Sequence, residues 1–283
     1  MADIAVVIVS YRTGPTLHAC LDRVLAEPGV GTVALVDNGN DAATLEALTR
    51  RAAAAPRLRV LTGHGNVGFA AGCNRGVRAT AEPFVLLLNP DCLIEPGSLV
   101  ALRVAVGDRP HPWIATVRVL DESGTEQRGS RRNGGTPGQC VVEALRLGGV
   151  LTGLNLNRAP LPSTLTAVPA ISGAFMLMPR TTFDALGGLD EGYFLHVEDL
   201  DFCLRLRRAG GLAYFAPTLT CTHVKGTSAA PALIVERHKV RGFRRFFGTH
   251  FAVSHPRVVL AAAWLLLAGG LLLRGWLQDL RRA

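Results

Sequence analysis

Aromatic residues are scarce in this chain: phenylalanine, tryptophan and tyrosine make up 6% of its 283 residues. No helix-turn-helix, zinc-finger or RNA-binding signature accompanies them, so we expect no nucleic-acid partner. The six cysteines include no CxxC pair and no zinc-ligand spacing, which favours a reduced, cytosol-facing protein. The first ten residues lack a basic start and a long apolar run, so we expect no signal peptide.

Basic residues outnumber acidic ones, 30 to 22, and the net charge is +8. A basic surface suits a polyanionic partner. With nucleic acid disfavoured, an anionic membrane or a diphosphate substrate remains. Hydrophobic residues make up 48% of the chain. A chain of this length can bury a large core as one α/β domain with an appendage, although two domains remain possible.

Short apolar runs alternate with helical patterns in the first half of the chain. We expect strands at residues 4–9, 33–36, 58–61 and 84–88, and helices at residues 16–26, 44–54 and 72–80. Strands that alternate with helices predict a mostly parallel sheet with right-handed crossovers. The expected fold class is therefore α/β, with a Rossmann-like central sheet and flanking helices.

Asp91 follows the apolar run 84–88, which predicts a strand buried on both faces. Pro90 cannot continue the ladder and helps to end that strand. Asp91 is therefore expected at the carboxyl edge of the sheet, where open α/β folds bind ligands. The alternative is that Asp91 only caps the turn at residues 95–98.

A second acidic cluster, Glu198, Asp199 and Asp201, stands at the start of a helix expected over residues 197–208. Its carboxylates could act as a general base. They could also merely complement the helix dipole, with arginines near the other end. His223 follows the cluster and would, taken alone, be a loop histidine.

The glycine-rich segment 63–76 is neither a GxGxxG motif after the first strand nor a Walker loop. Glycines before a helix let backbone N–H groups approach a nucleotide closely. The alternative is a plain flexible loop. Asp37, at the end of the second strand, could bond a base or ribose, or only serve its own Asp-Asn-Gly turn.

Seven motifs and His223 form a specific set when taken in order. They are VIVSY at 7–11, VDNG at 36–39, GNVGFA at 65–70, LNPD at 88–91, SGAF at 172–175, GGLDE at 187–191 and FLHVEDLD at 194–201. This set resembles inverting family 2 glycosyltransferases with the GT-A fold, most of all the rhamnosyltransferase-like branch that extends lipid-linked or cell-surface glycans. The resemblance runs from residue 5 to about residue 251.

The resemblance implies a role for each matching residue. Asp199 would be the catalytic base with Glu198 beside it. Asp91 would bind Mg²⁺ or Mn²⁺, and His223 would bind the metal or contact the diphosphate. The first position of the metal motif is Asn89, so a single carboxylate must hold the metal. The implied donor-binding residues are Ser10, Tyr11, Arg12, Asp37, Asn66, Gly68, Asn74 and Asn89.

The same resemblance implies the reaction and the organisation of the chain. A sugar, in the first instance rhamnose from dTDP-rhamnose, would pass with inversion from a nucleotide-diphosphate donor to a hydroxyl of a lipid-linked or cell-surface glycan. Residues 1–115 would form the nucleotide-sugar-binding half and residues 116–230 the acceptor-binding and catalytic half. Two alternatives are a non-catalytic nucleotide-sugar-binding scaffold and a nucleotidyltransferase.

Residues 231–283 predict membrane association. Residues 233–251 carry phenylalanines on one helical face with arginines beside it, which suits an anionic interface. The uncharged run 258–273 falls short of the ~20 residues of a spanning helix. We expect peripheral or C-terminally anchored attachment to the cytoplasmic face of the cell membrane. The alternatives are packing against the catalytic domain or between subunits.

Each of two further segments has two possible interpretations. The basic, glycine-rich segment 128–138 could be a lid that closes over a diphosphate, or a solvated loop. The apolar segment 140–156 is expected to be helical, and could line an acceptor or lipid groove or belong to the ordinary core.

Overall fold

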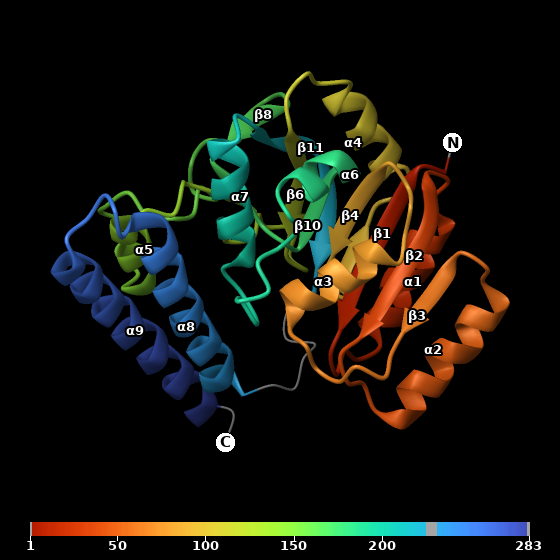
Figure 1. The fold of residues 1–283 in the computed structure, drawn as a ribbon, viewed down its shortest axis with the longest axis horizontal. Coiled ribbons are helices and arrows are strands. Elements are labelled where there is room, and N and C mark those ends of the chain that lie inside the picture. Colours follow the sequence, from red (N-terminus) through yellow and green to blue (C-terminus); the bar gives the residue numbers. More distant parts are fainter. Residues whose placement is uncertain (1, 225–230, 282–283) are drawn as a thin grey trace.

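The computed structural model describes residues 2–224 and 231–281. A central sheet lies between helices, and two long C-terminal helices stand at one side of the molecule (Figure 1). The strands of this sheet are β1 (Ile4–Ser10), β2 (Val30–Asp37), β3 (Leu58–Leu61), β4 (Phe84–Leu88), β5 (Cys92–Ile94), β6 (Trp113–Leu120), β8 (Thr166–Val168), β10 (Phe175–Pro179) and β11 (Leu212–His223). A small ribbon consists of β7 (Arg131–Arg132) and β9 (Ala170–Ile171).

The helices lie between these strands in the chain and after the last of them. They are α1 (Thr16–Ala26), α2 (Ala42–Ala54), α3 (Phe69–Arg78), α4 (Ser98–Val106), α5 (Pro137–Ala144), α6 (Arg180–Ala185), α7 (Glu198–Arg208), α8 (Ala232–Phe251) and α9 (Arg257–Leu280). The elements expected in the first half are confirmed, with shifts of a few residues at their ends.

The strand order in the described part of the chain is β3-β2-β1-β4-β10-β6-β11-β5, and β8 pairs with β11. β1 is parallel to β2 and β4, and β2 is parallel to β3. β10 is antiparallel to both β4 and β6, whereas β11 is parallel to β6. β6 and β11 therefore run in the same direction as β1. The carboxyl ends of β1, β2, β4 and β11 meet at one edge, and the expected mostly parallel α/β sheet is confirmed.

The side chains of β1 pack against two layers of helices, because successive residues of a strand point to opposite faces. Ile4, Val6 and Ile8 belong to a core cluster with residues of α1, α2 and α4. Val7 and Val9 belong to a second cluster with residues of α3, α6, α7 and the C-terminal helices. The strand is buried along its whole length, as expected for the middle of a covered sheet.

One expected helix is much shorter in the structure. Residues 140–156 were expected to be helical, but α5 ends at Ala144. Arg146 adopts a φ of 59°, which cannot continue a right-handed helix, and Gly148 and Gly149 follow it. The helical prediction for the second part of this segment was wrong.

α8 and α9 lie side by side (Figure 1). The indole N–H of Trp264 donates to the carbonyl of Val240 at 3.0 Å. The carboxylate of Asp279 accepts hydrogen bonds from the backbone N–H groups of Ala232 (2.8 Å) and Leu233 (2.9 Å). Asp279 thus satisfies donors in the first turn of α8 that have no partner within that helix.

α9 extends beyond the apolar run that the sequence suggested, because the helix continues through Arg274 to Leu280. In the described part of the chain it is the one helix long and apolar enough to cross a membrane, judged by length and composition alone. Its inner face, with Leu260, Leu267 and Leu271, is buried in the same core cluster as α7 and α8.

Candidate functional site

Polar residues gather where the parallel strands end. Ser10 and Asp37 are Cα partners at the ends of β1 and β2. Asn89 directly follows β4, Asp91 lies in the turn after it, and His223 is the last residue of β11. Four separate strands therefore deliver candidate ligands to one edge of the sheet, as expected for an open α/β fold.

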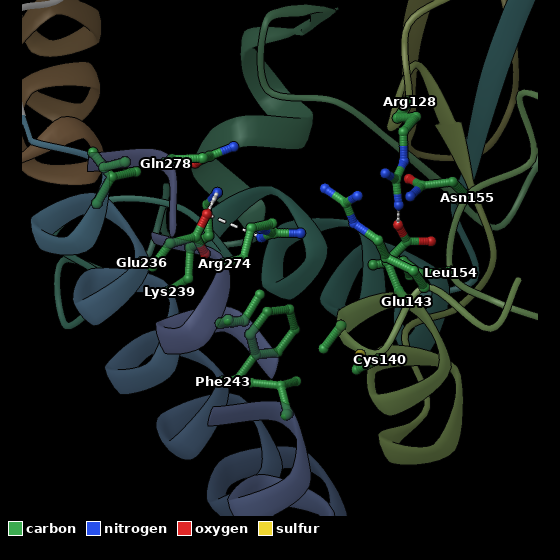
Figure 2. A pocket seen from close by; sticks show the side chains of 16 residues that line it. Arg128, Cys140, Glu143, Leu154, Asn155, Glu236, Lys239, Phe243, Arg274 and Gln278 are labelled. Carbon is green, nitrogen blue, oxygen red and sulfur yellow. Dashed lines mark hydrogen bonds and ion pairs between the residues drawn. The ribbon is translucent and has the colours of Figure 1, made fainter. Parts of the chain in front are cut away.

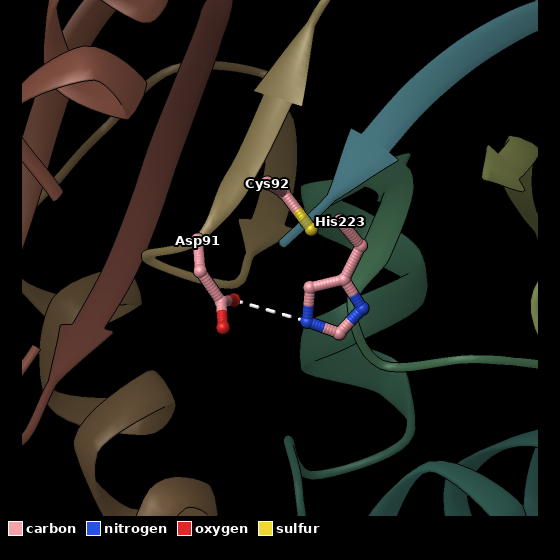
Figure 3. Close-up of side chains that lie close together, drawn as sticks. All are labelled: Asp91, Cys92 and His223. Atoms are coloured by element: carbon pink, nitrogen blue, oxygen red, sulfur yellow. Dashed lines mark ion pairs between the residues drawn. The ribbon is translucent and has the colours of Figure 1, made fainter. Parts of the chain in front are cut away.

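Asp91 and His223 contact each other at this edge (Figure 3). His223 Nε2 lies 3.0 Å from Asp91 Oδ1. Asn89 Nδ2 lies 3.5 Å from the same ring nitrogen. Asp91 therefore does not cap α4, whose N-cap residue is Gly97.

Gln127 sets the tautomer of His223. Its Nε2 donates to the His223 carbonyl at 2.6 Å, which fixes the orientation of the amide. Its Oε1 then faces His223 Nδ1 at 3.0 Å and accepts a hydrogen bond from it. In this tautomer the lone pair of His223 Nε2 points toward Asp91 Oδ1, so two hydrogen-bond acceptors face each other. A cation bound between these two atoms would make their contact favourable.

The side chains around this contact fit a hard divalent cation. Asp91, Cys92 and His223 each place one ligand atom within 4.8 Å of the other two. The Cys92 thiol, however, is fully buried and donates to the Ala174 carbonyl, and burial raises its pKa well above the usual value. Thiols also suit softer metals. The side chains that could hold Mg²⁺ or Mn²⁺ are therefore Asp91 and His223, and two protein ligands would leave most coordination positions of such a cation open.

Asp199 lies at the start of α7 and is surrounded by donors. Its Oδ2 accepts from Arg132 Nη1 at 2.9 Å and from the backbone N–H of Gly173 at 3.0 Å. Its Oδ1 accepts from the backbone N–H of Leu200 at 2.8 Å. These contacts hold the carboxylate in one orientation beside the 172–175 motif.

The chain enters α7 through a strained turn. His196 and Val197 have φ values of 66° and 75°, in the left-handed region that β-branched residues avoid. A Cβ on Gly242 of α8 would lie 3.0 Å from Val197 Cγ2, so the glycine allows α8 to pack closely against the turn. Packing by α8 therefore helps to fix the direction in which Glu198 and Asp199 leave the turn.

Glu198 differs in protonation from an ordinary surface carboxyl. Burial, and next the charge of Asp199, raise the pKa of Glu198 from 4.5 to about 8. Its Oε2 is buried and has no hydrogen-bond partner among the described residues. Near neutral pH the neutral acid predominates, so Glu198 is poorly suited to act as the base.

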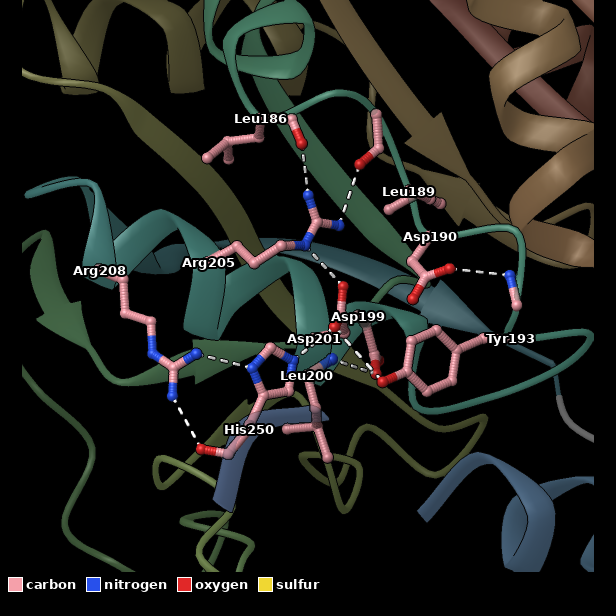
Figure 4. Close-up of polar contacts among 12 residues, drawn as sticks. Leu186, Leu189, Asp190, Tyr193, Asp199, Leu200, Asp201, Arg205, Arg208 and His250 are labelled. Atoms are coloured by element: carbon pink, nitrogen blue, oxygen red, sulfur yellow. Dashed lines mark hydrogen bonds and ion pairs between the residues drawn. The ribbon is translucent and has the colours of Figure 1, made fainter. Parts of the chain in front are cut away.

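Asp201 belongs to a buried network that joins α7 to α8 (Figure 4). Arg208 donates to His250 Nδ1 at 2.8 Å, so the opposite nitrogen, Nε2, donates to Asp201 Oδ1 at 2.6 Å. Arg205 Nε donates to Asp201 Oδ2 at 2.7 Å. Burial would raise the pKa of Asp201, but the hydrogen bond from His250 and the charge of Arg205 lower it overall. Asp201 therefore positions the helix and is not available to substrate.

Asp37 is bonded within its own turn. Its Oδ1 accepts from the backbone N–H groups of Gly39 (3.2 Å) and Asn40 (2.9 Å) and from Asn40 Nδ2 (2.7 Å). Ser10 bonds the same Asn40 side chain, and Tyr11 lies against Gly39. The structure thus brings the residues after β1 and β2 together, while their contact with a base stays a prediction.

The glycine-rich segment forms an ordered turn before α3. Asn66 Oδ1 accepts from the backbone N–H of Gly68 at 3.1 Å, and Asn38 Nδ2 donates to the Gly68 carbonyl at 2.9 Å. A Cβ on Gly68 would lie 2.6 Å from the Phe194 carbonyl, so only glycine fits there. This turn therefore contacts the segment that leads into α7.

The remaining predicted donor residues differ in their surroundings. Asn74 is buried. Its Nδ2 donates to the Leu189 carbonyl at 2.8 Å and its Oδ1 accepts from the Leu189 N–H at 3.0 Å, so it anchors the 187–191 motif. Arg12 is exposed and its guanidinium carbon lies 5.3 Å from the centre of the Tyr11 ring. Arg12 follows Ser10 at the sheet edge, whereas the Asn74 side chain joins α3 to the 187–191 motif.

Sequence reasoning missed Gln127 and the role of Arg132. The sequence of segment 128–138 predicts either a lid or a solvated loop. In the structure, however, Arg131 is buried and pairs with Glu126 at 2.9 Å. Arg132 pairs with Asp199, and both arginines belong to β7. The high arginine content of this segment was the one available signal, and charge alone did not distinguish an internal partner from solvent.

The mostly parallel sheet, with polar residues gathered at the carboxyl edge of its strands, defines a class of protein by its fold, the GT-A glycosyltransferases. The chain belongs to glycosyltransferase family 2: the family described as "Glycosyltransferase like family 2" matches residues 2–243. The resemblance inferred from the motifs is confirmed, and it favours the glycosyltransferase over the scaffold and nucleotidyltransferase alternatives.

Two curated relatives are rhamnosyltransferases. The N-acetylglucosaminyl-diphospho-decaprenol L-rhamnosyltransferase of Mycobacterium tuberculosis is 29% identical over 252 residues, which cover 81% of this chain and 78% of that protein. Rhamnosyltransferase WbbL of Escherichia coli is 27% identical over 163 residues, which cover 57% of this chain and 60% of that protein.

Solved structures show the same fold. The mannosyltransferase PcManGT of Pyrobaculum calidifontis, in complex with GDP-Man and Mn²⁺, has a TM-score of 0.61 and 16% identity, covering 95% of this chain and 73% of that one. GalNAc-T7 with UDP, GalNAc and Mn²⁺ also has a TM-score of 0.61 and 16% identity, covering 84% of this chain and 47% of that one. The expected GT-A fold is therefore confirmed.

Proposed function

We propose that this protein is an inverting glycosyltransferase that transfers rhamnose from dTDP-rhamnose to a hydroxyl of a polyprenyl-diphosphate-linked sugar. The names of the two curated relatives support the sugar, and the name of the mycobacterial relative supports the acceptor class. Residues 1–115 form the donor half in this proposal, and residues 116–230 form the acceptor and catalytic half.

One observation carries the proposal: the two carboxylate sites flank a single short segment. The Gly173 N–H donates to Asp199 at 3.0 Å, and the carbonyl of the next residue, Ala174, accepts from the Asn89 N–H at 2.9 Å. Asn89 in turn stands two residues before Asp91. Asp199 and the Asn89–Asp91 turn thus both contact residues 172–174, which supports a base and a diphosphate site with the substrate reacting between them.

Asp91 and His223 hold Mg²⁺ or Mn²⁺ in this proposal. When bound, the cation neutralises the charge that develops on the leaving nucleotide diphosphate. Gln127 keeps the ring of His223 in the tautomer that can bind a metal. Ser10, Tyr11 and the turn of Asp37 lie at the same edge, where they contact the nucleoside.

Asp199 accepts the proton of the attacking acceptor hydroxyl. Its three hydrogen-bond partners are all donors, and they orient the carboxylate without competing for a proton. Glu198 remains neutral beside it and does not compete as a base. Attack from the face opposite the leaving diphosphate is a single displacement, so the anomeric centre is inverted and no covalent nucleophile is needed.

We propose that α9 attaches the enzyme to the cytoplasmic face of the membrane by lying in the interface. α8 packs along α9 and carries exposed arginines, including Arg241 and Arg244. If α9 crossed the bilayer with α8 beside it, each arginine in the hydrocarbon would cost about 2.5–3.5 kcal/mol or more. Exposed apolar residues of α9, such as Leu265 and Leu266, can instead enter one leaflet while the arginines contact headgroups.

The test is to incubate the full-length protein with dTDP-rhamnose and a polyprenyl-diphosphate-linked N-acetylglucosamine. We expect dTDP release, a rhamnosylated lipid and an inverted anomeric configuration by NMR. Retention of configuration would contradict the single displacement. Release of nucleotide from a different nucleotide sugar only would contradict the donor, and binding without turnover of any donor would favour the non-catalytic alternative.

A further inference from the structure

A cavity that contains neither Asp91 nor Asp199 lies between α5, α8 and α9. Its volume is about 590 Å³. Figure 2 shows Glu236, Lys239 and Arg274 from the C-terminal helices on one side, and Arg128 and Glu143 on the other. A cavity of this size is large enough to take a small-molecule group.

The walls of this cavity carry a surplus of positive charge. Four cationic residues line it, Arg128, Arg146, Lys239 and Arg274, against the two carboxylates Glu143 and Glu236, which leaves a net charge of +2. Arg128 pairs with Glu143, while Lys239 and Arg274 share one oxygen of Glu236 at 3.0 and 2.9 Å. Arg146 has no ion pair within the described part of the chain. The arginines of this region also repel one another. Burial, and next the charges of Arg274 and Arg146, lower the pKa of Arg128.

Glu236 holds two cationic side chains of the C-terminal helices in the cavity wall. Its side chain is almost fully buried, and its Oε1 accepts hydrogen bonds from Lys239 Nζ and Arg274 Nη2. An ammonium and a guanidinium group are therefore fixed side by side where an anionic group could contact both.

The rest of the cavity is apolar and leads to α9. Phe243 and Cys140 lie below the charged groups in Figure 2, and Leu267 and Leu271 of α9 complete this wall. A ligand with a charged head in this cavity could therefore place a short hydrocarbon chain against this apolar wall.

The cavity is next to β7, whose residue Arg132 bonds the proposed base, Asp199. Asn155, which lines the cavity, is paired by a β-bridge with Arg132, and the Arg132 side chain bonds Asp199. Leu154, another lining residue, accepts from the Asn133 N–H at 2.7 Å. A molecule bound in the cavity therefore lies next to the segment that positions Asp199.

We propose that this cavity binds the diphosphate and the first isoprene units of the lipid-linked acceptor. The inference rests on the proposed function and names the site of its second substrate. A diphosphate diester carries two negative charges, which match the surplus of two positive charges. Lys239 and Arg274 contact the diphosphate, and the first isoprene units pack against Phe243, Leu267 and Leu271.

The experiment measures binding of a synthetic farnesyl-diphosphate-linked N-acetylglucosamine to the full-length protein by calorimetry in a mild detergent. Arg146→Gln and Arg274→Gln each remove one cavity charge. Arg50→Gln removes the same charge from an exposed position of α2, which does not line the cavity, so it is the matched control. We expect Kd to rise about 10-fold or more in the two cavity variants and to stay unchanged in the control, because hydrogen bonds to charged groups are the stronger ones.

Two comparisons separate the sources of binding. Farnesyl monophosphate lacks one phosphate and the sugar, and inorganic diphosphate lacks the prenyl chain and the sugar. Each should therefore bind the wild-type protein more weakly than the complete probe. Equal affinity of inorganic diphosphate, or wild-type Kd values in both cavity variants, would overturn the proposal. Arg274→Gln also breaks a buried ion pair, so the exposed Arg146 variant keeps the test independent of folding.

Failure of the proposed function has a different signature. In that case the wild-type protein would bind the prenyl-diphosphate probe, and the cavity variants would weaken it, yet no dTDP would be released from dTDP-rhamnose. Binding of dTDP to each variant checks that the donor edge is intact.

Discussion

The guanidinium of Arg132 lies 2.9 Å from the carboxylate of Asp199, although the two residues are 67 positions apart in the chain. The pair joins the small β7–β9 ribbon to the start of α7. Together with the N–H of Gly173 it holds Asp199 in one orientation. The position of the proposed base is therefore set by long-range contacts as well as by its own helix.

Replacement of Asp199 by asparagine should abolish most sugar transfer and leave donor binding intact. The change keeps the size of the side chain and removes its basicity, and a general base typically contributes about 10²–10⁴-fold to the rate. Turnover and dTDP-rhamnose binding are measured side by side. Asp184→Asn, an identical change at an exposed position of α6, is the control. Near-normal turnover of Asp199→Asn would remove this residue from the mechanism.

Loss of Arg132 should lower kcat more than it changes the KM of the donor. Arg132→Met removes one of the three donors to Asp199, and a hydrogen bond to a charged group is worth about 1.5–3 kcal/mol, or roughly 10–100-fold. Steady-state kinetics with varied dTDP-rhamnose separate the two constants. Arg50→Met, on the exposed surface of α2, is the control. An unchanged kcat would show that Gly173 and Leu200 suffice to orient the base.

Activity should require Mg²⁺ or Mn²⁺ and should depend on Asp91, His223 and, more weakly, Gln127. Asp91→Ala should weaken donor binding together with turnover. Gln127→Leu should raise the metal concentration for half-maximal activity by about 10–100-fold, because it frees the tautomer of the His223 ring. The measurement is a metal titration after treatment with chelator.

Cys92 provides the matched control for that titration. Its thiol lies near the proposed ligands but bonds the Ala174 carbonyl inside the core. Cys92→Ala should leave the metal requirement unchanged. A higher requirement in this variant would make the thiol a ligand, and full activity of the wild-type protein in excess chelator would exclude a metal requirement altogether.

Stability should fall as pH rises toward 8 because of Glu198. The folded-state pKa of about 8 is above the unfolded value, so the folded protein binds the proton more tightly. This stabilisation is fully present below the unfolded pKa and is lost as pH rises through the folded pKa, at a rate of up to roughly 1.4 kcal/mol per pH unit.

Glu198→Gln should remove that decline, because glutamine is neutral throughout. Denaturant unfolding of wild type and variant at several pH values between 5 and 8 compares the two slopes. Glu122→Gln, at an exposed position, should keep the wild-type slope. Parallel curves for wild type and Glu198→Gln would show that Glu198 ionises in the folded protein as it does in the unfolded chain.

Polar substitutions on the outer face of α9 should reduce membrane binding. Leu265, Leu266 and Leu273 are 62%, 53% and 57% exposed, and burial of one leucine in an apolar medium is worth about 1.5–3 kcal/mol. The triple change to glutamine should abolish flotation with anionic vesicles. Val104→Gln with Val150→Gln, at exposed apolar positions elsewhere, should still float with the vesicles. Undiminished flotation of the triple variant would show that the outer face of α9 does not attach the protein to the membrane.

Truncation before α9 is the weaker experiment. Leu260, Leu267 and Leu271 belong to the main core cluster, so a chain cut after Phe251 would expose apolar surface of α5 and α8. Loss of activity would then report loss of folding. Substitution of the outer face avoids this ambiguity.

The sequence by itself determined the sheet and the place of the carboxylates. Five apolar residues before Asn89 predict a strand covered on both faces, and Pro90 ends it, so Asp91 had to stand at the sheet edge. The helical pattern after Val197 likewise located Glu198 and Asp199 in a first turn. These features depend on the period of apolar residues along a short stretch of chain, which is local information.

Only the tertiary structure decided the partners of those carboxylates. Gln127 meets His223 across 96 positions, and the nearest signal in its neighbourhood was a basic segment that resembled a solvated loop. Glu198 and Asp199 are adjacent and chemically alike, yet burial keeps one neutral while Arg132 and two backbone N–H groups surround the other. Hydrogen bonds between distant strands and the desolvation of a buried acid depend on how the layers pack, and no local pattern of residue types encodes that packing.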